Sequence, residues 1–491
     1  MRHKLGGRCP AVAIASLCAL ASASKADPPT FGTDTAAASS KADTLVYGVD
    51  VGVAESDNVT LASTNKVSQT MAVADGDFDI KQQSRLLDVD AKGNFTYLDY
   101  LQGAYRGELI GRLDGSAHLA IIPDRLVWVV QDDFGQAAID AYTPQTPTNL
   151  ENVNYLSTGP DFALRFGASS YLNMSARYAR TDYETSPYNS NRLLGDLAWG
   201  YQLSAQSSVS LNGETERVLF TNTVVNSDFD RSSGFLRYEV KGARTELSAD
   251  LGATTVDQYG STTRPLARLN LTRKLSASAK LILTAGRDLT DAATSFSGLQ
   301  SGAIGLVGTA PAAQTTDNYT RSYASAAWQY ERNRTLISLS GRWEKDVYDS
   351  ATVTDVSVTG VPLSVAPLPG APVIGNAAAL DYTLGGAEFR VQRRMTRALT
   401  AEIVGRIYKT DYLHSTVTGQ FGTPNYSNEQ VAAGLTWRHG RGLVVKLRYE
   451  HNAQVTTGIY GYGENRVVLT VGYRPNGNKP ESDPGALSPG P

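Results

Sequence analysis

Six aspartates near the start of the chain form its densest set of side chains with chemical potential: Asp50, Asp75, Asp77, Asp79, Asp88 and Asp90. We call them the acidic set. Asp75, Asp77 and Asp79 have the spacing that opens a calcium-binding EF-hand loop. The sixth position of such a loop would be Ile80 instead of glycine, and the twelfth would be Leu86 instead of glutamate. The EF-hand pattern therefore fails, and we expect no metal site and no cofactor.

A second set of charged residues, the basic set, lies in the last third of the chain: Arg342, Arg390, Arg406, Arg438, Lys446, Arg448 and Arg466. Glutamates and an aspartate are interleaved with it, at Glu344, Asp346, Glu388, Glu402 and Glu450. Side chains of both signs on neighbouring elements can pair as salt bridges that stiffen the structure. Alternatively, the basic set faces the acidic set and produces a field that orients anionic or polar solutes.

Motifs for enzymatic chemistry are missing from the sequence. It contains no Gly-x-Ser-x-Gly, no His-Glu-x-x-His and no Gly-x-x-x-x-Gly-Lys. The histidines after the N-terminal region, His118, His414, His439 and His451, stand in no recognisable arrangement with a nucleophile. The net charge of −3 also gives no basic excess that would indicate binding to nucleic acid. We predict that the protein is not an enzyme and does not bind nucleic acid.

The N-terminal region has the pattern of a secretory signal. Arg2, Lys4 and Arg8 precede an apolar stretch, residues 11–21, and Ala21-Ser22-Ala23 is a small-x-small cleavage site. Residues 1–23 are therefore predicted to be a signal peptide, with a rival cleavage site after residue 26. Both cysteines, at positions 9 and 18, lie within it, so the exported chain has no disulfide. Residues 27–43 are expected to be a periplasmic extension, and residues 475–491 a disordered periplasmic tail.

Apolar and polar residues alternate along the rest of the chain. Leu45, Tyr47, Val49, Val51 and Val53 share one face of a predicted strand, and Asp50 lies on the other. The same period of two recurs in residues 172–178, 337–344, 399–408 and 466–473. No long helical period intervenes, so the chain is predicted to be all-β.

The connections between the predicted strands alternate strictly between short and long. Short breaks near residues 83, 124, 168, 205, 242, 276, 333, 395 and 440 are separated by longer ones. This alternation is typical of an outer-membrane barrel with tight periplasmic turns and long extracellular loops. Residues 44–474 are therefore predicted to form a transmembrane antiparallel β-barrel of about 20 strands, between 18 and 22. The expected location is the outer membrane of a Gram-negative bacterium.

This barrel explains a composition that would otherwise suggest a soluble protein. Outward residues must be apolar and inward ones can face water, so the mean hydropathy is only −0.25. The acidic and basic sets fall on the inward face. Tyrosines such as Tyr47, Tyr178 and Tyr473 are expected to form interfacial girdles. Residues 292–316 and 356–380 lack charges and are predicted to be loops; the second either folds inward as a constriction or covers the rim.

Two segments resemble a known family. They are Val51-Gly-Val-Ala-Glu-Ser-Asp-Asn-Val-Thr-Leu61 and Asn152-Val-Asn-Tyr-Leu-Ser-Thr-Gly-Pro-Asp-Phe-Ala-Leu-Arg-Phe-Gly167. They resemble segments of a family of β-barrel porins found with exopolysaccharide and PEP-CTERM surface-sorting gene clusters. The resemblance implies an outer-membrane location and a part in exopolysaccharide export, and it brings no catalytic residues.

The sequence thus predicts an outer-membrane channel for saccharides or for exported exopolysaccharide. The first alternative is a plugged structural or assembly barrel of the cell surface, and the second is a barrel-embedded hydrolase. Expected partners are outer-membrane lipids, lipopolysaccharide and the barrel-assembly machinery, together with exopolysaccharide and its periplasmic export partners.

Overall fold

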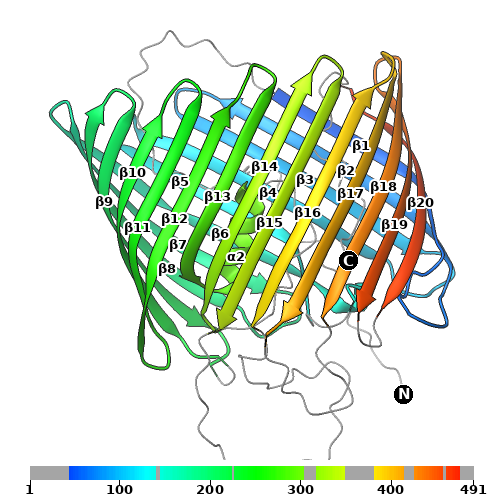
Figure 1. Cartoon of the computed structure of the whole chain (residues 1–491), viewed down its shortest axis with the longest axis horizontal. Helices are drawn as coiled ribbons and strands as arrows, with labels where there is room; N and C mark the ends of the chain where they lie inside the picture. The colour runs from blue at the N-terminus through cyan, green and yellow to red at the C-terminus, as the bar shows by residue number, and fades with distance from the viewer. Residues whose placement is uncertain are drawn as a thin grey trace, which may run out of the picture.

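Twenty antiparallel strands close into one barrel in the computed structural model of the chain (Figure 1). The structure describes residues 44–139, 144–223, 226–302, 317–348, 381–413, 425–456 and 461–475. Consecutive strands pair with each other around the wall, and β1 (Thr44–Ser56) pairs with β20 (Tyr462–Tyr473) to complete the circle. The prediction of a 20-stranded all-β barrel is confirmed.

The strands contain 12 to 17 residues each. After β1 they are β2 (Gln69–Gln83), β3 (Leu87–Tyr100), β4 (Glu108–Ile122), β5 (Leu126–Ala138), β6 (Leu150–Phe166), β7 (Ser170–Tyr183), β8 (Ser190–Ser204), β9 (Ser207–Phe220), β10 (Phe229–Lys241), β11 (Thr245–Asp257), β12 (Ser261–Lys274), β13 (Ala279–Thr290), β14 (Tyr319–Arg332), β15 (Thr335–Tyr348), β16 (Tyr382–Arg394), β17 (Leu399–Tyr412), β18 (Tyr426–His439), β19 (Leu443–Thr456) and β20. In the part of the chain that the structure describes, two helical segments lie in connections, the 3₁₀ helix η2 (Pro147–Asn149) and the helix α2 (Ala292–Gly302).

Short and long connections alternate between the two rims. The turns after the even-numbered strands are short, such as the two residues between β14 and β15, and they lie at the upper rim in Figure 1. The connections after the odd-numbered strands lie at the lower rim. We call this lower rim the long-loop end. The alternation that the sequence predicted is therefore present in the structure.

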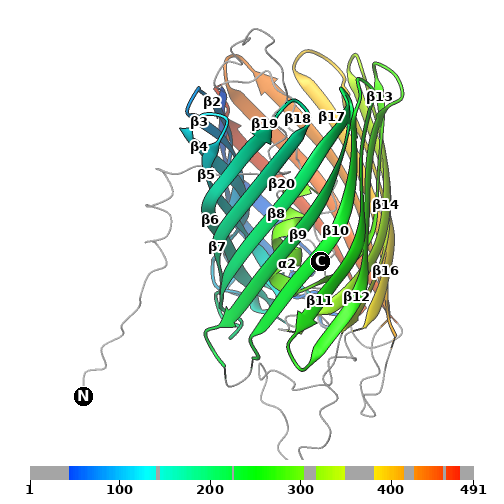
Figure 2. The ribbon, with the colours of Figure 1, turned by 90° about the vertical axis from the view of Figure 1, so that its left-hand side faces the viewer.

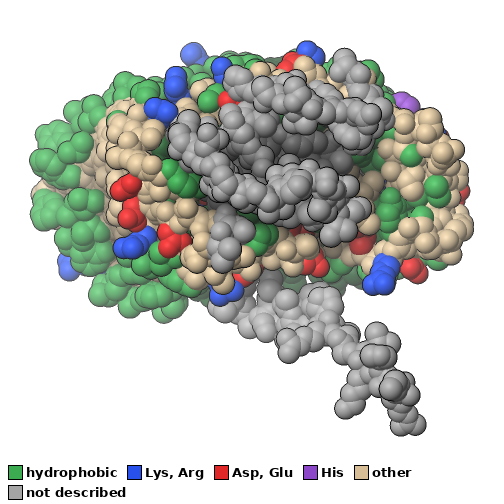
Figure 3. Space-filling model, turned by 90° about the horizontal axis from the view of Figure 1, so that it is seen from below, with side chains coloured by type: hydrophobic (Ala, Val, Ile, Leu, Met, Phe, Trp, Pro, Cys, Tyr) green, Lys and Arg blue, Asp and Glu red, His purple; other side chains and the backbone are tan. Residues whose placement is uncertain are grey.

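The outer surface of the barrel is apolar. Large hydrophobic side chains stand exposed on the outward positions, including Leu251 at 69%, Trp199 at 61% and Val51 at 59% of their full area. Viewed from the long-loop end, hydrophobic side chains cover the outer wall where β9 and its neighbours lie, and charged ones gather at the rim (Figure 3). A closed sheet satisfies its backbone amides, and such an apolar surface needs a lipid surround. The protein is an outer-membrane barrel. No helix among the described residues is long and apolar enough to span a membrane.

The helix α2, at the start of the connection between β13 and β14, lies inside the wall in two perpendicular views (Figures 1 and 2). The prediction that residues 292–316 form only a loop was therefore wrong for residues 292–302. Asp291 begins the helix, since its backbone carbonyl accepts a hydrogen bond from the amide of Ser295 at 3.0 Å and its carboxylate accepts one from Thr294 Oγ1 at 2.6 Å. The segment 356–380, which is predicted from the sequence either to fold inward as a constriction or to cover the rim, lies outside the described residues.

Candidate functional site in the lumen

The acidic and basic sets both lie on the inner face of the barrel. In β1, Asp50 is 1% exposed, whereas Val49 and Val51 on either side are more than half exposed to the outside. In β17 and β19, Arg406 and Arg448 are buried on the inward positions. The alternation of strand side chains therefore placed both sets on the correct face.

The pairing within the acidic set differs from the expectation. From the sequence, a turn near residue 83 sets Asp79 opposite Asp88 and Asp77 opposite Asp90, and water, a counter-cation or the neighbouring Lys81 and Lys92 are expected to compensate these like charges. In the structure, the turn lies at residues 84–86, so Asp79 faces Lys92 and Asp90 faces Lys81. Lys81 Nζ lies 2.9 Å from Asp90 Oδ2. Opposite charges thus face each other across β2 and β3, so the two lysines compensate Asp79 and Asp90, although the register differs.

Acidic residues do face each other across β1 and β2, where Asp50 lies opposite Asp75. Two cations compensate Asp50: Lys446 Nζ lies 3.2 Å and Arg474 Nη2 lies 3.0 Å from its Oδ2 atom. Arg474 also donates from Nη1 to Asp77 Oδ2 at 2.8 Å. We call these four residues, Asp50, Asp77, Lys446 and Arg474, the seam cluster, because they join the first two strands to the last two.

The seam cluster bears on the hypothesis that a basic wall faces an acidic wall, because it shows where the two sets adjoin. β1 pairs with β20, so the acidic strands β1–β3 adjoin the late strands that carry Lys446, Arg448 and Arg466. Lys446, on the late strand β19, pairs directly with Asp50 of β1. The field across the lumen stays a prediction.

The basic set is paired along the wall. Arg406 Nε donates to Glu388 at 3.0 Å, and Arg448 Nε donates to Glu450 at 2.5 Å. Arg342 donates to Glu344, Arg390 lies 3.5 Å from Glu402, and Arg466 donates to Glu464 at 2.8 Å. These contacts support the salt-bridge interpretation. The wall thus presents positively charged hydrogen-bond donors and negatively charged acceptors to the lumen.

A second ionic cluster holds α2 inside the barrel. Asp291 Oδ2 lies 2.5 Å from Arg192 Nη2 of β8, and Asp291 Oδ1 lies 3.2 Å from Arg231 Nη1 of β10. Glu216 of β9 bonds both arginines. We call these four residues the α2 latch. Arg192 is 1% exposed. Burial raises the pKa of the Asp291 carboxyl, but Arg192 and Arg231 outweigh burial and hold that pKa below its usual value.

The segment that the latch holds crosses the lumen. On one side Ser295 Oγ lies 2.6 Å from Tyr319 Oη of β14. On the other side Phe296 packs against a cluster of Ala137, Val153 and Tyr183 from β5, β6 and β7. Because β6 and β14 are eight positions apart in the order of strands around the wall, the beginning of α2 narrows the lumen between them.

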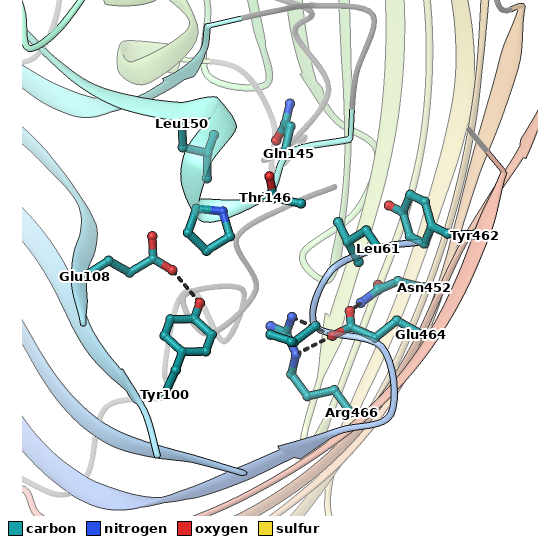
Figure 4. Close-up of a pocket in the computed structure, with 12 residues that line it drawn as sticks. Leu61, Tyr100, Glu108, Gln145, Thr146, Leu150, Asn452, Tyr462, Glu464 and Arg466 are labelled. Carbon is teal, nitrogen blue, oxygen red and sulfur yellow. Dashed lines mark hydrogen bonds and ion pairs between the residues drawn. The ribbon is translucent and has the colours of Figure 1, made fainter. Parts of the chain in front are cut away.

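A pocket lies inside the barrel at the long-loop end, with about 430 Å³ of space between its side chains (Figure 4). Tyr100 and Glu108 form one side, where the Tyr100 hydroxyl donates to Glu108 Oε1 at 2.6 Å. The other side consists of Asn452, Tyr462, Glu464 and Arg466, from β19 and β20. Leu61 and the segment around Pro147 and Leu150 complete the lining. We call this the mouth pocket.

The first segment with a family resemblance builds part of this pocket. Ser56 Oγ donates to Glu464 at 2.6 Å, and Asn58 Nδ2 donates to the carbonyls of Ala62 at 2.8 Å and Gly463 at 3.1 Å. These bonds turn the loop into the barrel, where Val59 joins an apolar cluster with Met71, Leu98 and Tyr100. Residues 56–61 therefore position Val59 and Leu61 in the pocket lining.

Comparisons with known proteins show similarity of architecture. No protein-family model matches the chain, and no curated protein matches it. Among solved structures, the siderophore receptor PirA from Pseudomonas aeruginosa is similar, with 11% identity, 88% of this chain and 80% of that chain covered, and a TM-score of 0.40. The FrpB iron transporter from Neisseria meningitidis (F5-1 variant) has 10% identity, covers 88% of this chain and 82% of that chain, and has a TM-score of 0.44.

Sequence reasoning missed the α2 latch and much of the mouth pocket. Arg192 and Asp291 are 99 residues apart in the sequence, with Arg231 between them, so no short motif contains all three. One local signal was available: Asp291 and Thr294 have the spacing of a helix N-cap with its partner. The inward position of Tyr462 follows from strand parity, but its neighbours Tyr100 and Glu108 depend on the closure between β1 and β20.

Proposed function

We propose that the protein is a channel for small polar solutes, including saccharides, across the outer membrane. The observation that carries the proposal is a charged and polar inner wall that the latched helix α2 narrows. Charged side chains such as Glu450, Glu464 and Arg448 line this wall in paired form. A wall of this kind is compatible with water and with hydroxylated solutes, whose lost hydrogen bonds to water it can replace.

The pairing of charges favours passage over tight binding. A carboxylate whose cation lies 2.5–3.0 Å away, as in Arg448–Glu450 and Arg406–Glu388, exerts only a weak attraction on a passing ion. Conduction requires that solutes enter readily and also leave. The mixed wall therefore supports a channel with modest affinity along its length.

Reconstitution tests this proposal directly. We expect the full-length protein to give discrete ion conductance in planar bilayers, and proteoliposomes to swell in solutions of small neutral sugars. Empty liposomes prepared with the same detergent are the control. The absence of both conductance and swelling would favour the plugged structural barrel, and hydrolysis of lipid or peptide substrates would favour the hydrolase.

Ion selectivity should depend on the paired arginines. Changing Arg406→Ala together with Arg448→Ala leaves Glu388, Glu402 and Glu450 without these partners, so the lumen becomes more acidic. We expect the cation-to-anion permeability ratio, measured from the reversal potential in a salt gradient, to rise by about sevenfold, because a change of about one kT in local potential raises cation partition and lowers anion partition by about 2.7-fold each. Arg180→Ala, in an exposed ion pair with Asp182, is the control and should leave the ratio unchanged.

Export of exopolysaccharide through this barrel is also a proposal, and it rests on the sequence resemblance alone. Its test is the amount of exopolysaccharide on the surface of cells that lack the gene. Wild-type amounts would count against it.

A further inference from the structure

The mouth pocket contains buried polar atoms that the protein leaves without partners. Tyr462 is 6% exposed and Asn452 is 3% exposed, and both line the pocket. The hydroxyl of Tyr462 and the Oδ1 atom of Asn452 have no hydrogen-bond partner among the described residues. Such atoms are rare in folded proteins because leaving them unpaired costs free energy. A bound molecule with hydroxyl groups would supply what both atoms lack, a donor for Asn452 Oδ1 and a partner for the Tyr462 hydroxyl.

The rest of the lining alternates polar groups with apolar surface. Glu108, Glu464 and Arg466 offer charged acceptors and donors, while Leu61, Pro147 and Leu150 are apolar (Figure 4). The rings of Tyr100 and Tyr462 stand on the two sides of the space. A sugar ring has the matching surface: hydroxyl groups around its edge and C–H groups on its faces, which pack on aromatic and aliphatic side chains. The pocket is open to the lumen, so its roughly 430 Å³ of space is continuous with the solvent there.

The charges of the lining select among sugars. Glu108 and Glu464 contribute two negative charges, and Arg466 contributes one positive charge that Glu464 already engages at 2.8 Å. Ser56 and Asn452 also bond Glu464, which fixes the carboxylate beside the arginine. The lining thus has a formal charge of −1 and no cation without a carboxylate beside it. An acidic sugar would be repelled by Glu108, whereas a neutral one would not.

We propose that the mouth pocket is a binding site for a neutral saccharide unit at the long-loop entrance of the barrel. Tyr462 and Asn452 hydrogen-bond its hydroxyl groups, and Tyr100 and Leu61 pack against its ring. The site rests on the proposed channel function, in which it collects sugar at the entrance before passage. The site thus assigns neutral saccharides as the class of solute that the channel takes up.

Calorimetric titration of the full-length protein in detergent tests the site without requiring conductance. The probes are the neutral trisaccharides maltotriose, cellotriose and chitotriose, with trigalacturonate as the acidic counterpart. We expect at least one neutral probe to bind and trigalacturonate to bind more weakly. Tyr462→Phe removes a hydroxyl that bonds no described residue, so thermal unfolding should stay unchanged while the Kd rises roughly three- to tenfold.

Tyr408→Phe is the matched control. The Tyr408 hydroxyl is also buried and has no partner among the described residues, but Tyr408 is not part of the pocket lining. Its variant should bind the probes as the wild type does. Three results would each overturn the proposal: no binding of any neutral probe, equal affinity for trigalacturonate, or equal Kd values for the Tyr462→Phe and Tyr408→Phe variants. A protein that conducts ions but binds no probe keeps the channel function and loses the site, and one that binds but does not conduct loses the channel function.

Discussion

Changing Asp291→Asn is expected to release α2 from the wall and to raise the single-channel conductance of the barrel. Arg192 and Arg231 have side chains only 1% and 11% exposed, and Asp291 and Glu216 are their two carboxylate partners in the latch. Removing one partner of a buried ion pair costs about 3–5 kcal/mol because it leaves an uncompensated charge. Displacement of α2 from its position across the lumen lets water reach the arginines, avoids most of this cost and widens the channel.

The pH dependence of the latch has a definite sign. The pKa of Asp291 in the folded protein lies below its ordinary value of 3.8, so its ionised form is stabilised by folding. The stabilisation is complete above about pH 5 and is lost as the pH falls below 3.8 through the lowered folded pKa. The wild-type conductance should therefore be constant between about pH 5 and pH 7 and should rise only under stronger acid.

Single-channel recordings of the wild type and the variant at neutral pH check the prediction. Asp182→Asn is the matched control, since it makes the same change in an exposed pair with Arg180 whose side chains are 51% and 43% exposed. Exposed pairs contribute about 0–1 kcal/mol, so this variant should conduct as the wild type does. Equal conductance in all three proteins would mean that α2 does not limit the channel.

The architecture was predictable because strand periodicity is a local property. Outward Val49 and Val51 beside inward Asp50 require only the alternation of side chains, and the same rule placed Arg406 and Arg448 in the lumen. The alternation of connection lengths then indicated a barrel with two different rims. Neither inference needs to know which residues lie opposite each other.

The register between neighbouring strands and the closure of the barrel are harder to predict from the sequence, because each depends on contacts between residues far apart in the chain. Moving the β2–β3 turn from residue 83 to residues 84–86 replaces an Asp79–Asp88 pair with Asp79–Lys92. The same residues face the lumen in both registers, so the alternation of apolar and polar residues could not reveal that the predicted turn position was wrong. The tyrosines predicted for the girdles, such as Tyr47, Tyr178 and Tyr473, are exposed on the outer face, but ten other tyrosines are buried, among them Tyr100, Tyr408 and Tyr462. Tyrosine suits both surfaces, since it combines an apolar ring with a hydroxyl.

The helix α2 shows a different limit. Its sequence, Ala292–Gly302, contains no charged residue and has a weak helical pattern, so it was predicted to be a loop. The surrounding wall stabilises it through Arg192, Arg231 and Tyr319, which lie on three different strands. Tertiary contacts thus override a weak local preference.

Changing Arg474→Leu is expected to lower the stability of the closed barrel by about 3–5 kcal/mol. Arg474 bonds Asp50 and Asp77, and Asp75 faces Asp50 across the strands. Without Arg474, Lys446 is the remaining cation of the seam cluster beside these carboxylates. A Cβ atom on Gly48 would lie 2.7 Å from Arg474 Cζ, so glycine at that position leaves room for the guanidinium.

The seam cluster lies at the strand pairing that closes the barrel, and we therefore expect a large loss of stability in Arg474→Leu. β1 pairs with β20 through eight residue pairs, from Val49–Tyr473 to Ser56–Arg466, against thirteen between β1 and β2. The pairing between β1 and β20 is the one that removes both open edges of the sheet, and an open edge in lipid leaves amides unpaired. A charge imbalance at this pairing therefore acts on the whole barrel and not on one hairpin.

Urea unfolding in detergent, followed by the change in gel mobility between folded and unfolded barrel, measures the effect. Arg474→Lys keeps the positive charge but cannot contact Asp50 and Asp77 with two separate nitrogens as the guanidinium does. Its loss of stability should therefore be smaller than that of Arg474→Leu. Lys409→Leu, in an exposed pair with Asp411, should change stability by less than about 1 kcal/mol. If Arg474→Leu is no more destabilising than Lys409→Leu, the backbone ladder alone holds β1 and β20 together, and the seam cluster adds nothing to closure.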